Sequence, residues 1–181
     1  MFANYRKLLN KIDSFVAGVM VRHPASFKCA PGCSKCCVAG ITVWRVEADH
    51  IQEYLSSLDK RVMSSSGDRC AFLDDEGRCS IYQARPVVCR IWGAPLLIPA
   101  GSESDWAIRD HTVSGEKEGL VISCDLNFTG IELIEELPDT ELLNTKTAIT
   151  ALAAVNHVYC RENGLDPEER IPLGHLTQDL P

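Results

Sequence analysis

Three long stretches of the chain carry apolar residues at helical spacing. Over residues 2–22 and 46–58 the apolar positions recur at i, i+3, i+4 and i+7, which places them on one face of an amphipathic helix. The longest such pattern covers residues 140–163, and Gly164 follows it, as glycine often does at the end of a helix. We therefore expect three helices, and the apolar face of the last comprises Leu142, Leu143, Ile149, Leu152, Val155 and Tyr159.

Shorter apolar stretches predict strands and a hairpin. VAGITVW over 38–44 and LVIS over 120–123 are rich in β-branched residues, which favour strands. Residues 69–80 read as a hairpin, because the turn-forming sequence DDEG occupies 74–77 and Cys70 and Cys79 flank it. Residues 81–84 are expected to form a helical turn, and Pro86 is suited to open a short helix that carries Cys89. Residues 93–118 are expected to be irregular loops.

These elements predict a small α+β fold that is predominantly helical, with a short hairpin and a cysteine-rich metal-binding centre. The 181 residues suffice for one domain with a modest core, so we expect a single domain over 1–181. Within it, residues 29–90 would form the metal-binding core and 139–164 the C-terminal helix. The tail over 165–181 holds three prolines, and we expect it to be loosely ordered.

The charge of the chain argues against two classes of binding partner. The formal net charge is −7, and no cluster of Lys and Arg offsets it, which argues against binding to nucleic acid or to an anionic membrane. The apolar stretch FVAGVMV at 15–21 is too short to span a bilayer, and charged residues interrupt what precedes it, unlike a signal peptide. We therefore expect a cytoplasmic protein, in a compartment that keeps thiols reduced.

The chain has nine cysteines, an odd number, and seven of them lie between residues 29 and 89. Four stand within the sequence CAPGCSKCC at 29–37, where the x2 spacing between the second and third lets both sulfurs reach one ion. An odd count in a reducing compartment fits a disulfide framework poorly, so metal or cluster ligation is the leading interpretation. Cys160 lies in the last predicted helix and is expected to be a buried structural thiol. The candidate metal ligands are Cys29, Cys33, Cys36, Cys37, Cys70, Cys79, Cys89 and Cys124.

The thiols alone do not decide between zinc and iron, since both accept thiolate ligands. Four thiolates around zinc would make a structural site without redox function, whereas an iron–sulfur cluster can carry electrons. The clustering of the cysteines on loops favours an iron–sulfur cluster, with [4Fe–4S] as the type. Arg85 and Arg90 flank Cys89 and are candidates to donate hydrogen bonds to cluster sulfurs or to offset thiolate charge.

The motif as a whole resembles a known family. CAPGCSKCC is followed by RCAFLDDEGRCSIYQARPVVCR over 69–90, and together they are similar to the cysteine-cluster, zinc- or iron-chelating domain family (CxxCxxCC, YkgJ-type). The likeness covers residues 29–90. It implies binding of a metal or an iron–sulfur cluster, and as ligands it implies Cys29, Cys33, Cys36, Cys37, Cys70, Cys79 and Cys89.

Three functional hypotheses follow. The first is an iron–sulfur protein in electron transfer or in a redox-linked modification, with a redox or substrate protein as its partner. The second is a zinc-stabilised structural or interaction module without catalysis. The third is a modifying enzyme that depends on its cluster. The sequence leaves the substrate, the partner and the oligomeric state open.

Overall fold

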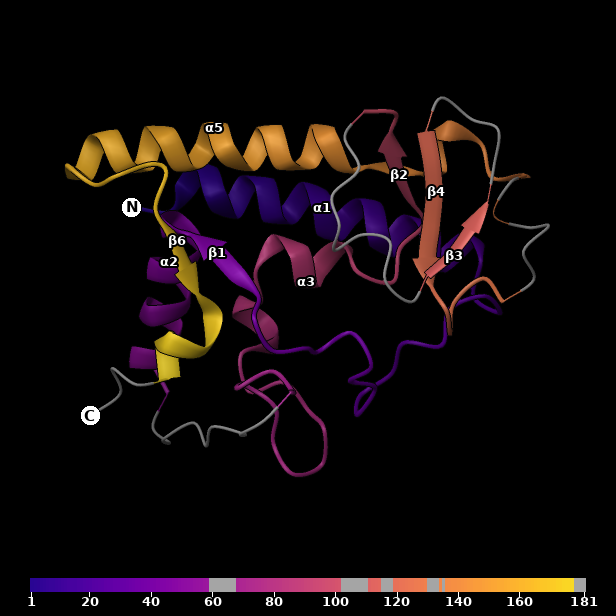
Figure 1. The fold of residues 1–181 in the computed structure, drawn as a ribbon, viewed down its shortest axis with the longest axis horizontal. Coiled ribbons are helices and arrows are strands. Elements are labelled where there is room, and N and C mark those ends of the chain that lie inside the picture. Colours follow the sequence, from indigo (N-terminus) through magenta and orange to yellow (C-terminus); the bar gives the residue numbers. More distant parts are fainter. Residues whose placement is uncertain (59–67, 102–110, 115–118, 130–133, 135, 178–181) are drawn as a thin grey trace. The chain divides into compact units, whose positions relative to one another are not determined.

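The computed structural model describes residues 1–58, 68–101, 111–114, 119–129, 134 and 136–177 (Figure 1). We expected a single domain, and the described residues pack as two compact units. Unit 1 comprises residues 1–8, 30–89 and 152–181, and unit 2 comprises 9–29 and 90–151. The helices α1 (Ala3–Arg22) and α5 (Thr145–Asn163) each contribute residues to both units. The combination of helices with short sheets confirms the predicted α+β class.

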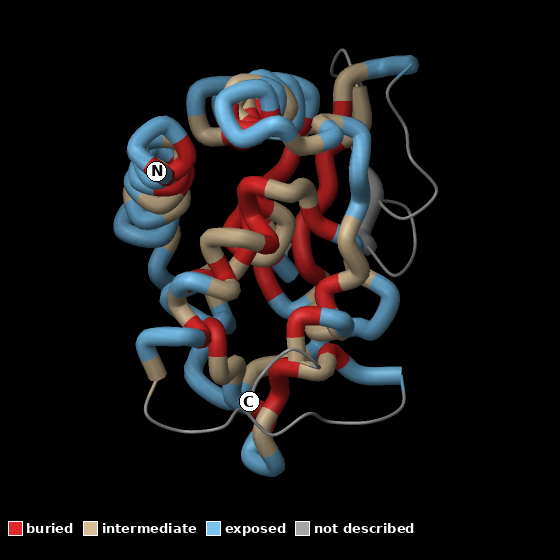
Figure 2. The backbone as a smooth tube through the Cα atoms, turned by 90° about the vertical axis from the view of Figure 1, so that its left-hand side faces the viewer, coloured by how far each residue is buried: buried red, intermediate tan, exposed pale blue. Residues whose placement is uncertain are grey.

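The helix α1 follows the predicted pattern. Its buried side chains are Tyr5, Leu9, Ile12 and Val19, which recur at intervals of three or four residues along most of the helix. In Figure 2 the helix that starts at the N-terminus carries buried residues along one side and exposed residues along the other. The helix ends at Arg22, just before the His23-Pro24 pair, because a residue that precedes proline is disfavoured in the helical conformation.

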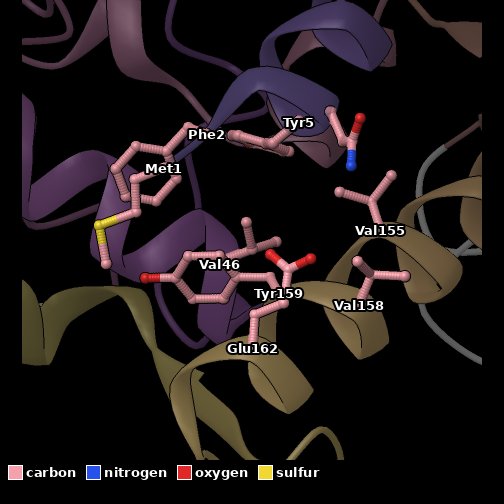
Figure 3. A pocket seen from close by; sticks show the side chains of 9 residues that line it. Met1, Phe2, Tyr5, Val46, Val155, Val158, Tyr159 and Glu162 are labelled. Carbon is pink, nitrogen blue, oxygen red and sulfur yellow. The ribbon is translucent and has the colours of Figure 1, made fainter.

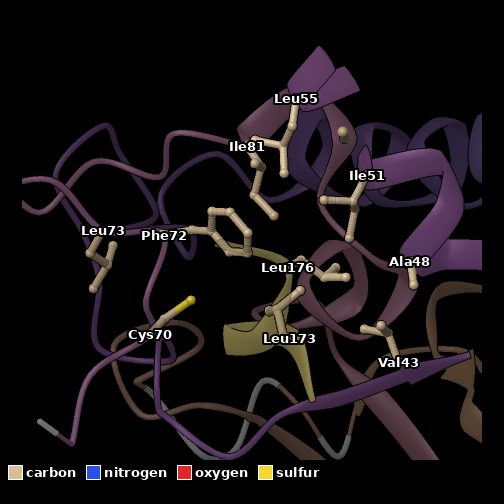
Figure 4. Packing of buried hydrophobic residues seen from close by; sticks show 11 residues of the cluster. Val43, Ala48, Ile51, Leu55, Cys70, Phe72, Leu73, Ile81, Leu173 and Leu176 are labelled. Atoms are coloured by element: carbon tan, nitrogen blue, oxygen red, sulfur yellow. The ribbon is translucent and has the colours of Figure 1, made fainter. Parts of the chain in front are cut away.

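Unit 1 contains the helix α2 (Arg45–Ser56), the 3-10 turn η1 (Tyr82–Ala84), most of the short helix α3 (Val87–Ile91), and a two-stranded sheet. In this sheet β1 (Thr42–Trp44) pairs antiparallel with β6 (Arg170–Pro172), with Val43 opposite Ile171. Its core is drawn in Figure 4 and consists of Val43, Ala48, Ile51, Leu55, Cys70, Phe72, Leu73, Ile81, Ala84, Leu173 and Leu176. The core thus contains Cys70, one of the predicted ligands.

Unit 2 contains a four-stranded sheet with the order β3-β4-β2-β5. The strand β4 (Gly119–Cys124) pairs antiparallel with both β3 (His111–Ser114) and β2 (Leu96–Pro99), and β2 pairs in parallel with β5 (Leu143–Asn144). The 3-10 turn η2 (Asp139–Glu141) precedes β5. The core of this unit consists of Val19, Val121, Phe128, Ile134, Leu137 and Leu142, and Phe15, Phe27 and Leu97 pack against it.

Several expected boundaries are wrong. The strand predicted over 38–44 is confined to β1, and Val38 makes only an isolated bridge with Arg69. Residues 93–118, expected to be loops, contain β2 and β3; residues 102–110 and 115–118 lie outside the described part of the chain. These strands are stabilised by pairing with the predicted strand at 120–123, a long-range contact that local composition does not reveal.

The C-terminal helix begins later than its apolar pattern predicted. The Leu143 N–H donates to the Pro95 carbonyl at 2.9 Å, and Leu143 belongs to β5, not to the helix. The Asn144 side chain then accepts the Thr147 N–H at 3.0 Å, so it caps the first turn of α5. The predicted apolar face is also wrong for Ile149, which is 44% exposed. The predicted end of the helix is confirmed: Gly164 follows it with a φ of +68°.

The C-terminal tail is ordered over most of its length. We expected residues 165–181 to be loosely ordered, but 170–177 form β6 and the 3-10 turn η3 (Leu173–Thr177). The Leu173 N–H donates to the Ile41 carbonyl at 2.8 Å, and Leu173 and Leu176 are buried in the core of unit 1. Burial of two leucines offsets the entropy lost in fixing the segment. Residues 178–181 lie outside the described part.

Candidate metal centre

The cysteine-rich loop folds into two consecutive tight turns within unit 1. The Cys33 N–H donates to the Ala30 carbonyl at 2.9 Å, and the Cys37 N–H donates to the Ser34 carbonyl at 3.0 Å. Gly32 makes the first turn possible, since its φ is +89°, a conformation that costs glycine little. The loop therefore presents Cys33, Cys36 and Cys37 from a short and well-hydrogen-bonded piece of backbone.

Backbone contacts tie the next two cysteines to this loop. The Cys70 N–H donates to the Cys37 carbonyl at 3.0 Å. Cys79 lies opposite Leu73 in an isolated antiparallel bridge, which closes the tight turn over 74–78. The predicted hairpin is thus reduced to one bridge and its turn, in which the Asp74 N–H donates to the Arg78 carbonyl at 2.9 Å. The bridge pairs Cys79 with Leu73 and not with Cys70.

Cys89 lies in the short helix α3, close to the start that the sequence predicted. Pro86 immediately precedes the helix, and the Cys89 N–H donates to the Pro86 carbonyl at 3.0 Å. The start of α3 is also held by the buried carboxylate of Glu47, which accepts the Val87 N–H at 2.9 Å and the Trp44 N–H at 2.9 Å. One side chain thus joins the first turns of α2 and α3, two residues before Cys89.

Four of the predicted ligands converge in unit 1. Each of Cys36, Cys70, Cys79 and Cys89 interacts electrostatically with the other three. Burial raises the pKa of Cys70, Cys79 and Cys89, and the neighbouring thiols raise it further. A hydrogen bond with the Cys37 thiol, followed by burial, raises the pKa of Cys36. Because each thiol opposes the ionisation of the others, the four favour the neutral form when no cation is bound. A bound cation would instead favour their thiolate forms.

Backbone amides point at two of these sulfurs. The Phe72 N–H donates to the sulfur of Cys70, and the Ile81 N–H donates to the sulfur of Cys79. In both cases the donor is two residues after the cysteine. Hydrogen bonds of this kind stabilise the thiolate form and tune metal–sulfur centres. The two sites are therefore suited to thiolate ligands despite their burial.

The two arginines predicted beside the centre have different surroundings. Arg85 stacks on the ring of Tyr82 with its guanidinium carbon 4.0 Å from the ring centroid, and it donates to the Tyr82 carbonyl at 2.8 Å. The charge of Arg85 also lowers the pKa of Cys79, against the larger effect of burial. Arg90 belongs to unit 2, where its buried guanidinium donates to Asp13 at 2.5 Å.

Unit 2 holds the other two predicted ligands, Cys29 and Cys124. Cys29 is exposed, whereas Cys124 is the last residue of β4 and is 7% exposed. The Asn127 amide donates to the sulfur of Cys29 at 3.3 Å, and the Asn127 N–H donates to the Cys124 carbonyl at 2.8 Å. Burial raises the pKa of Cys124, Asp125 raises it further, and Cys29 adds a smaller effect in the same direction. These two thiols therefore form a pair on either side of Asn127.

The remaining cysteines differ from these groups. Cys33 and Cys37 are partly buried, and Cys37 packs against the core of unit 1. Cys160 is completely buried in α5, and its thiol contacts the Asn156 amide oxygen at 3.6 Å. Its burial is what we expected of a structural thiol. The roles of all eight predicted ligands remain predictions.

The thiols fit a soft metal by their chemistry more than by their present geometry. Thiolates are the ligands that zinc and iron–sulfur clusters prefer. Within the described residues, however, no three His, Cys, Asp or Glu side chains already stand as ligands of one ion. Binding would therefore require the four interacting sulfurs of unit 1 to draw closer.

One hollow among the described residues of unit 1 is too small to compete with the thiols as a candidate site. This hollow, lined by Phe2, Tyr5, Val46, Tyr159 and neighbouring residues, offers about 10 Å³, room for about one water molecule. Figure 3 shows aliphatic, aromatic and polar side chains around it, and its lining contains no cysteine. Among the described helices, none combines the length and apolar character needed to cross a bilayer.

Two residues that shape the site were missed by the sequence analysis. Glu47 stands three residues after Trp44, the spacing of a capping box, and this signal could have marked it as a helix cap. Its second hydrogen bond, to Val87, has no sequence signal. Asn127 has none either, because its partners Lys28, Cys29 and Gly93 are remote in the chain.

Comparisons with known proteins support metal binding through the cysteines. No curated protein and no solved structure matched the chain. A family model did match, and it covers the cysteine-rich loop, the bridge at Cys79 and the helix α3. Residues 28–111 match the CxxCxxCC family, described as "Putative zinc- or iron-chelating domain", which is the family that the cysteine motif resembles.

Proposed function

We propose that unit 1 binds a [4Fe–4S] cluster and that the protein works in the cytoplasm in electron transfer or in a redox-linked modification. The proposed ligands are Cys36, Cys70, Cys79 and Cys89. The observation that carries the proposal is the mutual interaction of these four thiols. The family match supports metal chelation in the same segment.

The cluster would supply one-electron chemistry, and the chain would supply its environment. The N–H groups of Phe72 and Ile81 favour the thiolate forms of Cys70 and Cys79. Arg85 brings a positive charge to Cys79, which offsets part of the negative charge of a thiolate-bound centre. Cys89 is partly buried, which limits the access of water to this side of the centre.

A zinc ion is the second candidate, because the same four thiols match the ligand number of a closed tetrahedral zinc site. Such a site would stabilise the fold and leave the protein without redox chemistry. The small apolar core of unit 1, which includes Cys70, would then depend on the metal for its stability. The two candidates differ in colour, in sulfide content and in response to reductant.

Metal and sulfide analysis of protein purified without oxygen tests the proposal. We expect about four irons and four acid-labile sulfides per chain, with a visible absorption band that bleaches on reduction by dithionite. Zinc in a colourless protein would refute the cluster and support the structural zinc site. Protein without bound metal would contradict both.

Serine variants identify the ligands. We expect Cys36→Ser and Cys89→Ser to lose the metal, while the matched control Cys160→Ser retains it, because Cys160 lies apart from the interacting thiols in unit 1 and bonds Asn156 instead. Equal metal content in all three variants would refute the assignment of ligands.

A further inference from the structure

The thiol pair of unit 2 is chemically asymmetric. Cys29 is exposed, and its sulfur accepts a hydrogen bond from the Asn127 amide at 3.3 Å. Cys124 is buried, and its thiol donates to the Asp125 carboxylate at 3.6 Å. The first sulfur is thus a hydrogen-bond acceptor on an exposed residue, and the second is a hydrogen-bond donor on a buried residue beside a carboxylate.

Asn127 is built into the fold at this position. Its side chain belongs to a residue only 1% exposed, its amide oxygen accepts the Lys28 N–H at 2.8 Å, and its amide nitrogen donates to the Gly93 carbonyl at 2.7 Å as well as to Cys29. An amide nitrogen carries two hydrogens, so both bonds form together. The donor to the Cys29 sulfur is therefore fixed in place.

Gly93 provides the space for this arrangement. Its φ is +98°, and a Cβ atom added to it would lie 3.0 Å from the Cys29 sulfur and 3.1 Å from the Asn127 amide nitrogen. Any larger residue would displace the sulfur or its donor. Gly93 and Cys124 also line the same small surface depression, together with Trp92 and Ser123.

We propose that Cys29 and Cys124 form a redox-active dithiol, in which Cys29 attacks a disulfide of low molecular weight, such as glutathione disulfide, and Cys124 resolves the mixed disulfide. This activity goes beyond the proposed metal centre and uses residues of unit 2 alone. Exposure of the attacking thiol and burial of the resolving thiol beside it are typical of reactive cysteine pairs.

The reaction proceeds in two balanced steps. The Cys29 thiolate attacks one sulfur of glutathione disulfide, whose S–S bond breaks while a bond to Cys29 forms and one glutathione thiolate leaves. Cys124 then attacks the Cys29 sulfur while its proton passes to Asp125; the bond between Cys29 and glutathione breaks, and the second glutathione leaves as a thiolate. The two protein sulfurs lose two electrons, which glutathione disulfide gains as two thiolates, and one of these takes up the Cys124 proton from Asp125.

The test uses the full chain with its metal bound. The protein is incubated without oxygen in buffers of increasing glutathione disulfide, free thiols are trapped with N-ethylmaleimide, and peptides are mapped by mass spectrometry, with fragment spectra separating Cys29 from Cys33. We expect a Cys29–Cys124 disulfide while the metal content stays unchanged.

Variants separate the two steps. Cys124→Ser should stop at glutathione bound to Cys29, and Asp125→Asn should accumulate the same species, with resolution about tenfold slower or more. Asn127→Asp keeps the acceptor for Lys28 but loses the donor to sulfur, so the pH profile of Cys29 attack should move up by about one unit. Cys160→Ser, the control, should behave as wild type.

Three results would overturn the proposal. The first is full trapping of both thiols at every ratio of glutathione disulfide. The second is wild-type protein that retains glutathione on Cys29 without a bond to Cys124. The third is loss of metal in Cys29→Ser or Cys124→Ser, which would make these thiols ligands. Metal analysis of the Cys36 and Cys89 variants is a separate measurement. The proposed metal centre can therefore be refuted while the dithiol stands, and the dithiol can be refuted while the metal centre stands.

Discussion

Replacement of Glu47 tests whether one buried carboxylate holds the first turns of α2 and α3 together. The side chain accepts the Trp44 and Val87 N–H groups, both at 2.9 Å, and it is 3% exposed. Burial raises its pKa, and its hydrogen bonds to Trp44 and Val87 partly offset this rise. Because Val87 begins the helix that carries Cys89, loss of Glu47 should disturb both stability and metal binding.

The magnitude follows from the two hydrogen bonds. Each of the two buried N–H groups that loses its acceptor costs about 1–3 kcal/mol. We expect Glu47→Ala to lower the free energy of unfolding by about 3 kcal/mol. Glu47→Gln keeps one acceptor oxygen but turns an amide towards the other N–H, and should cost about 1–2 kcal/mol.

Thermal unfolding with matched metal loading measures the effect. At about 2–4 °C per kcal/mol for a chain of this size, Tm should fall by roughly 6–12 °C in Glu47→Ala. Metal content should fall as well. The control is Glu53→Gln on the same helix, where the ion pair with Arg6 is about half exposed and contributes about 0–1 kcal/mol. Equal Tm values and metal contents for the Glu47 and Glu53 variants would refute the reasoning.

Three further predictions concern other parts of the chain. A hydrogen bond from His23, and then the pairing with Arg22, lowers the pKa of Glu141. The stability that Glu141 contributes is therefore present above its unfolded pKa of about 4.3 and is lost as pH falls through the lower folded value. The Tm difference between wild type and Glu141→Gln should narrow in acid, and a constant difference would contradict this. Gly93→Ala should lower the free energy of unfolding by about 1–3 kcal/mol and slow the attack of Cys29 on glutathione disulfide. Gly101 is a matched control, because it also has a positive φ but no atom lies within 4 Å of its added Cβ. Gly101→Ala should leave the rate of that reaction unchanged. Leu176→Ala should lower the free energy of unfolding in denaturant by about 2–5 kcal/mol, because Leu176 is 5% exposed in the core of unit 1. The control is Leu126→Ala, at a residue that is 36% exposed. Equal changes in the two variants would show that the tail does not stabilise the fold.

Local patterns predicted well where the physical cause is itself local. The helix over Ala3–Arg22 and the end of α5 before Gly164 followed from apolar spacing and from the conformations of proline and glycine. The short helix after Pro86 followed from the fixed φ of proline. The family match over 28–111 followed from the spacing of the cysteines.

Long-range pairing accounts for what the sequence predicted wrongly. Leu143 continued an apolar helical pattern, yet the Pro95 carbonyl recruits its N–H into a sheet. The tail looked too rich in proline to be ordered, yet it supplies Leu173 and Leu176 to a core. In both places a partner remote in sequence outweighs the local preference, because backbone pairing and apolar burial stabilise more than propensity costs.

The sequence by itself determined that this protein carries a cysteine-rich, metal-chelating segment, because ligand type and spacing are written along the chain. Spacing placed Cys33 and Cys36 within reach of one ion, but it did not show which of the eight candidate thiols meet in the fold. Only the tertiary structure brought Cys36, Cys70, Cys79 and Cys89 into mutual interaction, and only it placed Asn127 against Cys29. Electrostatic and hydrogen-bond energies depend on distance in space, and distances between remote residues are fixed by folding.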